Sequence, residues 1–167
     1  MEMRNQLPDQ SIYSAIITFP VVFTNLRIGI RTQNSKLVSV DFLSPTTPVK
    51  QAGDDTALRV VDLLKAYFIN SNVEFDIPLL IQGSGFQQKV WRVLRTIPPG
   101  QTCSYAHIAM QLNSSARAVG NACRANAVPI IIPCHRVVAK NGPGGYCGQT
   151  GGERLQIKHW LLQHERA

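Results

Sequence analysis

The sequence predicts an α/β N-terminal domain with a small antiparallel sheet and a mostly helical C-terminal domain that contains a helix-turn-helix. Strand-like apolar alternation is confined to the first 50 residues, apolar residues recur at helical spacing after residue 54, and the charge balance changes near residue 80. We therefore expect domains at 1–80 and 81–167. A hydrophobic content of 44% with 16% charged residues is typical of soluble globular chains.

The predicted sheet begins with a strand at residues 13–23. The segments LRIGIRT (26–32) and KLVSVDFL (36–43) follow, and the QNS between them favours a hairpin turn. Asp54 or Asp55 can then cap a helix whose apolar face is predicted to be Leu58, Val61, Leu64 and Phe68. NSNVEFDIP (70–78) is the expected connection. Because this half has no histidine, cysteine or glycine-rich phosphate loop, we expect it to act as a scaffold.

The second half predicts short helices separated by turns. One helix should bury Phe86, Val90, Val93, Leu94 and Ile97 and end at the PPG of residues 98–100. A shorter helix follows, capped by Thr102 or Ser104, with an inner face of Tyr105, Ile108, Ala109 and Leu112. After the NSS of residues 113–115, a helix capped by Ser115 should bury Ala116, Val119 and Cys123. Two short helices joined by a tight turn indicate a helix-turn-helix.

The charge distribution points to a polyanionic partner. Residues 1–80 hold seven Lys/Arg and eight Asp/Glu, a net −1, whereas residues 81–167 hold ten Lys/Arg and only Glu153 and Glu165, a net +8. No acidic residue occurs between Ile77 and Gly152. A surface made basic only for solubility normally mixes both signs, so this window favours nucleic-acid binding. Its cations are Lys89, Arg92, Arg95, Arg117, Arg124, Arg136 and Lys140.

The four cysteines and the start of the chain bear on its location. MEMRNQLPDQ has neither the apolar core nor the small-residue cleavage site of a signal peptide, which predicts a cytoplasmic protein with reduced thiols. No two cysteines have the C-x-x-C spacing of zinc ribbons or redox motifs. We therefore expect no metal and no membrane association.

IIIPCHRVV (130–138) places Cys134 beside His135. The isoleucines predict a buried strand, and Pro133 should end it so that a turn follows at Cys134. In a strand the two side chains would point to opposite faces, but in a turn they can cooperate. A thiol with a pKa of about 8.5 becomes a nucleophile when an imidazole, a cation or a helix N-terminus stabilises its thiolate. The alternative is a core cysteine followed by an incidental His-Arg pair.

Together with SYAHIA, RAVGNACRAN and HWLLQHE, this stretch resembles the O6-alkylguanine-DNA alkyltransferases, also called methylated-DNA–protein-cysteine methyltransferases. The likeness covers residues 83–165, with several motifs in the same order. It implies that Cys134 takes an alkyl group from O6-alkylguanine in double-stranded DNA, once per molecule and without a cofactor. It leaves O4-alkylthymine open as a second substrate, and we expect a monomer.

The resemblance also implies roles for single residues. His135 would be the base, acting through a bridging water, with Glu165 orienting its imidazole; Tyr105 would donate a hydrogen bond to the guanine. The DNA-binding residues would be Arg117, which replaces the flipped base, together with Ala118, Gly120, Arg124, Asn126 and Arg136. Asn126 would also end the recognition helix and link it to the active-site strand; a simple helix C-cap is its alternative interpretation, and both can hold at once. GPGGYCG (142–148) would line the base pocket through Tyr146 and Cys147, and the carbonyl of Val137 would accept from the guanine amino group.

Two other functions remain open from the residues themselves. A DNA-damage binder or transcription factor with a helix-turn-helix would need no thiol. A cysteine hydrolase would use Cys134 and His135 on an acyl or peptide substrate with repeated turnover. The acid-free basic window counts against a hydrolase, and the Cys-His pair counts against a non-catalytic binder.

Overall fold

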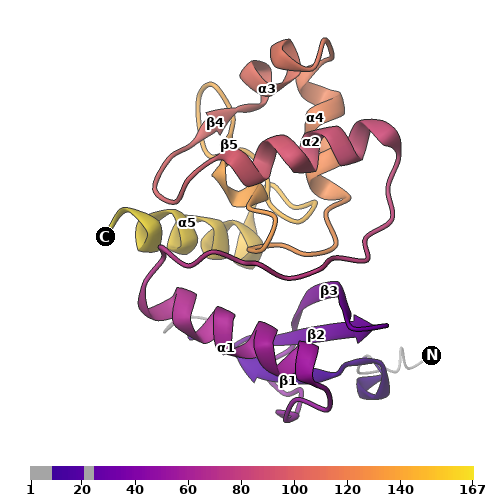
Figure 1. The fold of residues 1–167 in the computed structure, drawn as a ribbon. Helices are drawn as coiled ribbons and strands as arrows, with labels where there is room; N and C mark the ends of the chain where they lie inside the picture. Colours follow the sequence, from indigo (N-terminus) through magenta and orange to yellow (C-terminus); the bar gives the residue numbers. More distant parts are fainter. Residues whose placement is uncertain (1–8, 21–24) are drawn as a thin grey trace, which may run out of the picture.

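The first part of the chain is a small sheet covered by one helix. The structure, a computed structural model, describes residues 9–20 and 25–167. A short 3₁₀ turn, η1 (Gln10–Ile12), leads into β1 (Ala15–Thr18), β2 (Arg27–Gln33) and β3 (Lys36–Leu43), which pair antiparallel in that order. Helix α1 (Asp55–Ile69) packs across one face of the sheet (Figure 1). The predicted antiparallel sheet is confirmed.

The hairpin turn lies where the sequence predicts it. Asn34 and Ser35 both have positive φ, 51° and 57°, which matches the twist of the flanking strands. The first strand is shorter than expected, because β1 ends at Thr18. Residues 21–23 of the predicted strand, like residues 1–8 of the segment used to exclude a signal peptide, lie outside the described residues.

Helix α1 begins as predicted but buries a different set of side chains. The Asp54 carboxylate accepts from the backbone N–H of Ala57 at 2.8 Å and caps the helix. The prediction that Leu58 faces inward is wrong, because its side chain is 51% exposed. The helix docks through a stripe shifted around its axis, and the residues of that stripe are Ala57, Val60, Val61, Leu64 and Tyr67.

The second part is mostly helical. Its elements are α2 (Gly85–Thr96), β4 (Cys103–Ser104), α3 (Tyr105–Gln111), α4 (Ala116–Arg124), η2 (Cys134–Arg136), β5 (Val137–Val138) and α5 (Gly152–Arg166). A capping box between Ser84 and Gln87 starts α2, which ends before the predicted PPG turn. Trp91, absent from the predicted face, is buried and donates to the Ala122 carbonyl at 2.8 Å, so it ties α2 to α4.

Helices α3 and α4 form a compact pair joined by residues 112–115. The hydroxyls of Ser104 and Ser115 cap them, accepting from the N–H groups of His107 and Ala118. Four of the predicted inner residues are buried: Ile108, Ala109, Val119 and Cys123. The prediction that Ala116 is buried is wrong, because it is the first residue of α4 and lies on the exposed surface.

Residues 130–132 are buried as predicted but do not form a strand. Ile130 has φ +73°, and the Ile132 N–H donates back to the Val128 carbonyl at 2.9 Å, so the segment is a tight turn. Pro129 and Pro133 bracket it without N–H donors, which leaves too few groups for a regular ladder. The second half of the prediction holds, since η2 begins at Cys134.

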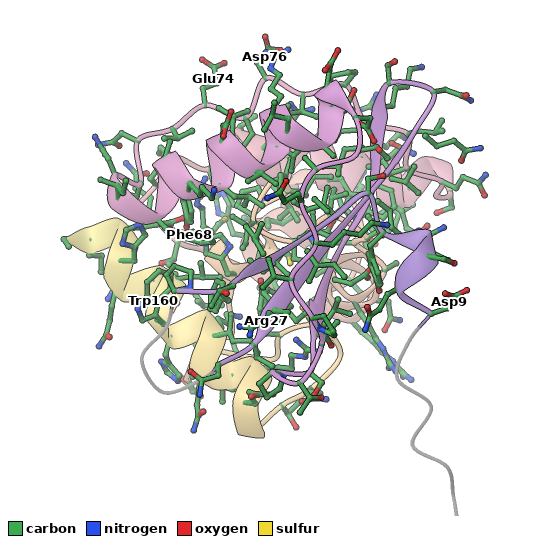
Figure 2. All side chains as sticks on the ribbon, turned by 90° about the horizontal axis from the view of Figure 1, so that it is seen from below. Asp9, Arg27, Phe68, Glu74, Asp76 and Trp160 are labelled. Atoms are coloured by element: carbon green, nitrogen blue, oxygen red, sulfur yellow. The ribbon has the colours of Figure 1, made fainter. Side chains whose placement is uncertain are left out.

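The two parts share one apolar core. A buried cluster includes residues of the sheet, α1, α2, α4 and α5. Aromatic rings join α1 to α5, where Phe68 and Trp160 lie 6.1 Å apart (Figure 2), and Phe19 packs edge-on against both. The described residues include no helix that is long and apolar enough to cross a membrane.

Candidate active site around Cys134

The turn η2 buries three reactive side chains in succession. Cys134, His135 and Arg136 are 5%, 0% and 7% exposed. Because a 3₁₀ turn rotates each residue by about 120°, neighbours point in different directions. Cys134 lines a pocket, whereas His135 and Arg136 contact Glu165 on α5.

The pocket beside Cys134 has a volume of about 320 Å³ and is open to solvent at its mouth. Its size lies within the range of small-molecule sites, about 300–1,000 Å³. Its walls come from α3, α4 and the loop after β5. They consist of Tyr105, Ala116, Gly120, Cys123, Arg124, Cys134 and residues 145–150.

The Cys134 thiol is held in its neutral form. Burial raises its pKa, and two groups oppose that effect: the Asn126 amide, which donates to Sγ at 3.3 Å, and the ammonium of Lys158. A buried thiol with a raised pKa is a poor nucleophile until a base takes its proton. Reaction at Cys134 therefore needs a base within reach.

The next residue, His135, has one ring nitrogen that is bonded and one that is able to accept a proton. Its Nε2 lies 2.7 Å from Oε1 of Glu165, an ionised acceptor, so Nε2 carries the hydrogen and Nδ1 has a free lone pair. Nδ1 is buried, and no side chain or carbonyl of the described residues bonds to it. Burial lowers the pKa of His135 against the pull of Glu165, so the imidazole is neutral and able to accept a proton.

Glu165 is kept ionised by several donors. Arg136 donates from Nε at 3.0 Å and from a terminal nitrogen at 2.8 Å, the Tyr67 hydroxyl donates at 2.7 Å, and the Gly100 N–H donates at 3.3 Å. Burial by itself would raise the carboxyl pKa, but the bonds from His135, Arg136 and Tyr67 outweigh it and leave the pKa well below its usual range. A charged, immobile carboxylate follows.

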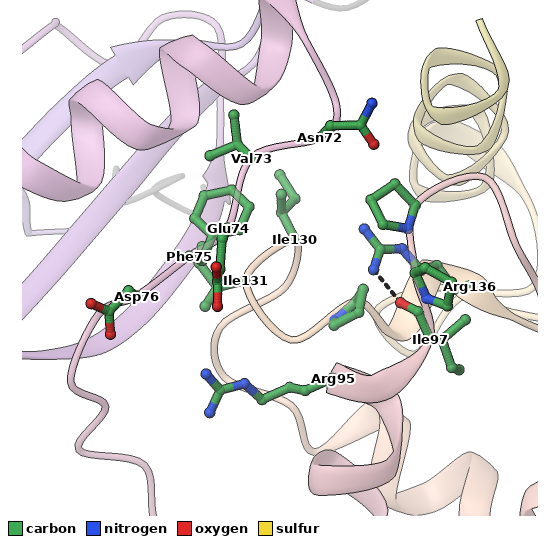
Figure 3. Close-up of a pocket in the computed structure, with 13 residues that line it drawn as sticks. Asn72, Val73, Glu74, Phe75, Asp76, Arg95, Ile97, Ile130, Ile131 and Arg136 are labelled. Atoms are coloured by element: carbon green, nitrogen blue, oxygen red, sulfur yellow. Dashed lines mark hydrogen bonds between the residues drawn. The ribbon is translucent and has the colours of Figure 1, made fainter.

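Arg136 does not lie where the sequence placed it. It was expected to contact DNA, but its guanidinium is buried against Glu165. The guanidinium also donates to the Ile97 carbonyl (Figure 3). The prediction that Arg136 contacts DNA is wrong. Its guanidinium neutralises the buried charge of Glu165, which would be costly to leave without a counterion. One edge of Arg136 reaches a second cavity, of about 370 Å³. That cavity also includes residues 72–76, Arg95, residues 97–99, Ile130, Ile131 and Pro133.

Asn126 also has a different role from a DNA contact. Its amide nitrogen donates to the Ile132 carbonyl at 2.9 Å and to Cys134 Sγ, and its oxygen accepts from the Val128 N–H. The cap residue of α4 is Ala125. The side chain thus braces the turn that carries the thiol, as a link between α4 and the active-site segment, and is not free to bind DNA.

Two buried residues of the site were missed. Lys158 on α5 is 0% exposed and donates to the carbonyls of Val137 at 2.6 Å and Gly145 at 2.9 Å; burial lowers its pKa to about 8. Tyr67 on α1 was counted in neither the core nor the site. In the sequence a lysine on an amphipathic helix is indistinguishable from a solvated one, so no local signal could have found Lys158.

Of the remaining predicted pocket residues, Tyr105, Tyr146 and Cys147 line the pocket, whereas Val137 is fully buried and is not among the lining residues. Tyr105 is half-buried there, and burial raises its pKa to about 12. The loop approaches Tyr105 so closely that a Cβ on residue 144 would lie 2.8 Å from the ring. Gly144 also has φ +72°, a conformation that favours glycine, so both the contact and the backbone require glycine there. Tyr146 is 3% exposed, and Cys147 lines the mouth. The Val137 carbonyl already accepts from Lys158, which leaves it one lone pair.

Helix α4 borders the pocket and carries two of the predicted cations. Arg117 and Arg124 are exposed, and Ala118 and Gly120 are half-buried on the same helix. Arg124 and Gly120 line the pocket itself. The α4 side of the pocket is therefore formed by Arg124, the small residues Ala116 and Gly120, and Cys123.

Comparison with known proteins identifies the family. Residues 85–167 match the model of the 6-O-methylguanine DNA methyltransferase DNA-binding domain. A probable methylated-DNA–protein-cysteine methyltransferase of Acanthamoeba polyphaga mimivirus is 41% identical over 79% of this chain and 83% of its own length. The chain belongs to the methylated-DNA–protein-cysteine methyltransferase family.

Solved and bacterial members of this family extend the likeness. The Mycobacterium tuberculosis OGT in complex with DNA is 37% identical, with a TM-score of 0.69 over 84% of this chain and 86% of that one. The Mycolicibacterium paratuberculosis methyltransferase is 47% identical over 64% of this chain, and the match spans 63% of its length. The fold and the reactive half of the chain are thus both those of the methyltransferases.

Proposed function

We propose that Cys134 is the residue that accepts the alkyl group in this chain. The chain is a DNA-repair methyltransferase that transfers an alkyl group from O6-alkylguanine in DNA to one of its own cysteines. Cys123 and Cys147 line the same pocket, but Cys134 alone is followed by a base. The observation that carries the proposal is the bond between His135 Nε2 and Glu165, which leaves Nδ1 as a buried, unprotonated acceptor.

The reaction balances without a cofactor. Through a bridging water, Nδ1 of His135 takes the thiol proton, and the sulfur attacks the alkyl carbon in line. The bond between the alkyl carbon and O6 breaks, and guanine leaves with the electron pair. The proton then passes from His135 to the departing guanine. The Tyr105 hydroxyl, with its raised pKa, stays protonated and donates to the departing guanine. The thioether that forms is stable, so each molecule reacts once.

The helices α3 and α4 are proposed to be a helix-turn-helix that binds DNA. The exposed Arg117 and Arg124, with the small Ala118 and Gly120 between them, would let α4 approach the duplex closely. The target base lies inside the stack, so the nucleotide must turn outward to reach Cys134. Arg117, at the start of α4, would fill the space that the base leaves.

Label transfer tests the proposal. Duplex DNA with radioactive methyl on O6-methylguanine is incubated with the full chain, and the labelled peptide is identified by mass spectrometry. We expect one label per molecule on Cys134, none in Cys134→Ser, and full labelling in the matched variants Cys123→Ser and Cys147→Ser. Repeated turnover on an acyl substrate would favour a hydrolase instead, and repair that survives Cys134→Ser would favour a non-catalytic binder.

Three further features belong to the proposal. The chain is divided into domains near residue 80, and the protein acts as a monomer. The cytoplasmic location is supported by the cysteines, because none of the four is in a disulfide within the described chain.

A further inference from the structure

The N-terminal part of the chain reaches the catalytic relay at one point. The Tyr67 hydroxyl on α1 donates to Oε1 of Glu165 at 2.7 Å, and the same oxygen accepts from His135 Nε2 at 2.7 Å. All three side chains are buried. We propose that Tyr67 is a positioning residue of alkyl transfer, so that the N-terminal part tunes the base that activates Cys134. This inference rests on the function proposed above.

Residues from α5 and from the segment after α1 hold Tyr67 in place. His164 on α5 bonds the Tyr67 carbonyl through Nε2 at 2.6 Å and packs edge-on against its ring at 5.3 Å. Phe75, from the segment after α1, packs against the ring at 5.6 Å. Burial, and then the charge of Glu165, raise the pKa of Tyr67 far above its usual value. The hydroxyl therefore donates at every pH at which the protein is folded.

The shared oxygen explains what this bond does. A donor at Oε1 lowers the basicity of the Glu165 carboxylate. The proton between Glu165 and His135 therefore stays on His135 Nε2, which leaves Nδ1 as the free acceptor. Without Tyr67, Glu165 is more basic, and its less compensated charge also makes the imidazole easier to protonate. The pKa values of Glu165 and His135 therefore both rise. The proposed relay is then protonated, and inactive, already at a higher pH.

The pH dependence of the single-turnover rate tests the inference. We compare the wild type with Tyr67→Phe, which keeps the ring and loses only the hydroxyl, from pH 5 to 9. We expect a roughly threefold to tenfold slower rate at neutral pH, the size of one hydrogen bond, and a loss of activity on the acid side that begins at higher pH. The matched control is Tyr13→Phe, a tyrosine in the separate cluster with Ile16 and Leu43.

A second readout does not depend on alkyl transfer. The ¹⁵N shifts of the His135 ring report its tautomer and its pKa, and we expect that pKa to be higher in Tyr67→Phe than in the wild type. An unchanged His135 titration, or a slower rate whose acid limb stays in place, would overturn the role of Tyr67. Failure of the wild type to take up label would instead overturn the proposed function, with the histidine titration still deciding the inference.

Discussion

Cys134 and Glu165 are the two ends of the proposed relay through His135, and their surroundings differ. Among the described residues, Glu165 accepts hydrogen bonds from His135, Arg136, Tyr67 and Gly100, whereas Asn126 is the side-chain donor to the Cys134 sulfur. The pKa of Glu165 is lowered, and the pKa of Cys134 is raised. The structure thus stabilises charge permanently at the carboxylate and leaves the sulfur neutral until it reacts. A buried thiol with a raised pKa is a poor nucleophile until a base takes its proton.

Glu165→Gln should have the largest effect, because it removes the permanent charge. It leaves the Arg136 guanidinium buried without its counterion, so we expect a loss of about 3 kcal/mol of stability. Because the imidazole then loses its orienting anion, the transfer rate should fall on the order of 100-fold. Urea unfolding and label transfer measure these effects. Glu153→Gln, on the exposed start of the same helix, is the control and should change neither.

Lys158→Met changes the other end of the relay. Its ammonium opposes the raised pKa of Cys134, so its loss should slow transfer roughly tenfold near pH 7. Because the pKa of Lys158 is about 8, the wild type loses this charge above that pH, and the two rates should converge there. A constant ratio across pH 6–9 would contradict an electrostatic role. Lys65→Met, at an exposed site on α1, should leave the rate unchanged.

Asn126→Ala tests the brace of the thiol. It removes the donor to Sγ and leaves the carbonyl of Ile132 and the N–H of Val128 without their partner. We expect a loss of about 1–3 kcal/mol in stability and a slower reaction with thiol reagents, since the Cys134 pKa rises further. Asn121→Ala, on the exposed face of α4, is the matched control in denaturant unfolding. Equal stability of the two variants would refute the brace.

The pH dependence of stability should show the smallest effect. His135 and Glu165 both have pKa values in the folded protein below their usual 6.5 and 4.5. As pH falls, the unfolded chain takes up protons that the folded chain refuses, so stability is full above about pH 6.5 and decreases below it, by on the order of 1–2 kcal/mol. Urea midpoints from pH 8 to pH 4 measure this. Glu165→Gln should remove the part of the decrease that lies below pH 4.5.

The elements were largely predictable where local chemistry decides them. The caps at Asp54, Ser104 and Ser115 and the hairpin at Asn34 were found because each depends on neighbours in the sequence. The errors were of another kind. Leu58 and Ala116 have the right spacing for a buried face but lie outside the stripe on which each helix docks. Periodicity gives the existence of an apolar face, whereas its position on the helix depends on what packs against it.

By itself the sequence determined the reactive turn, because Pro133, Cys134 and His135 are adjacent and a turn is the conformation that lets neighbours cooperate. Only the tertiary structure decided the partners of that turn. Tyr67 and Glu165 are 98 positions apart, and Arg136 is 29 positions from the same carboxylate. The physical reason is that a charge can be buried only where donors from separate elements converge, and packing alone sets that convergence.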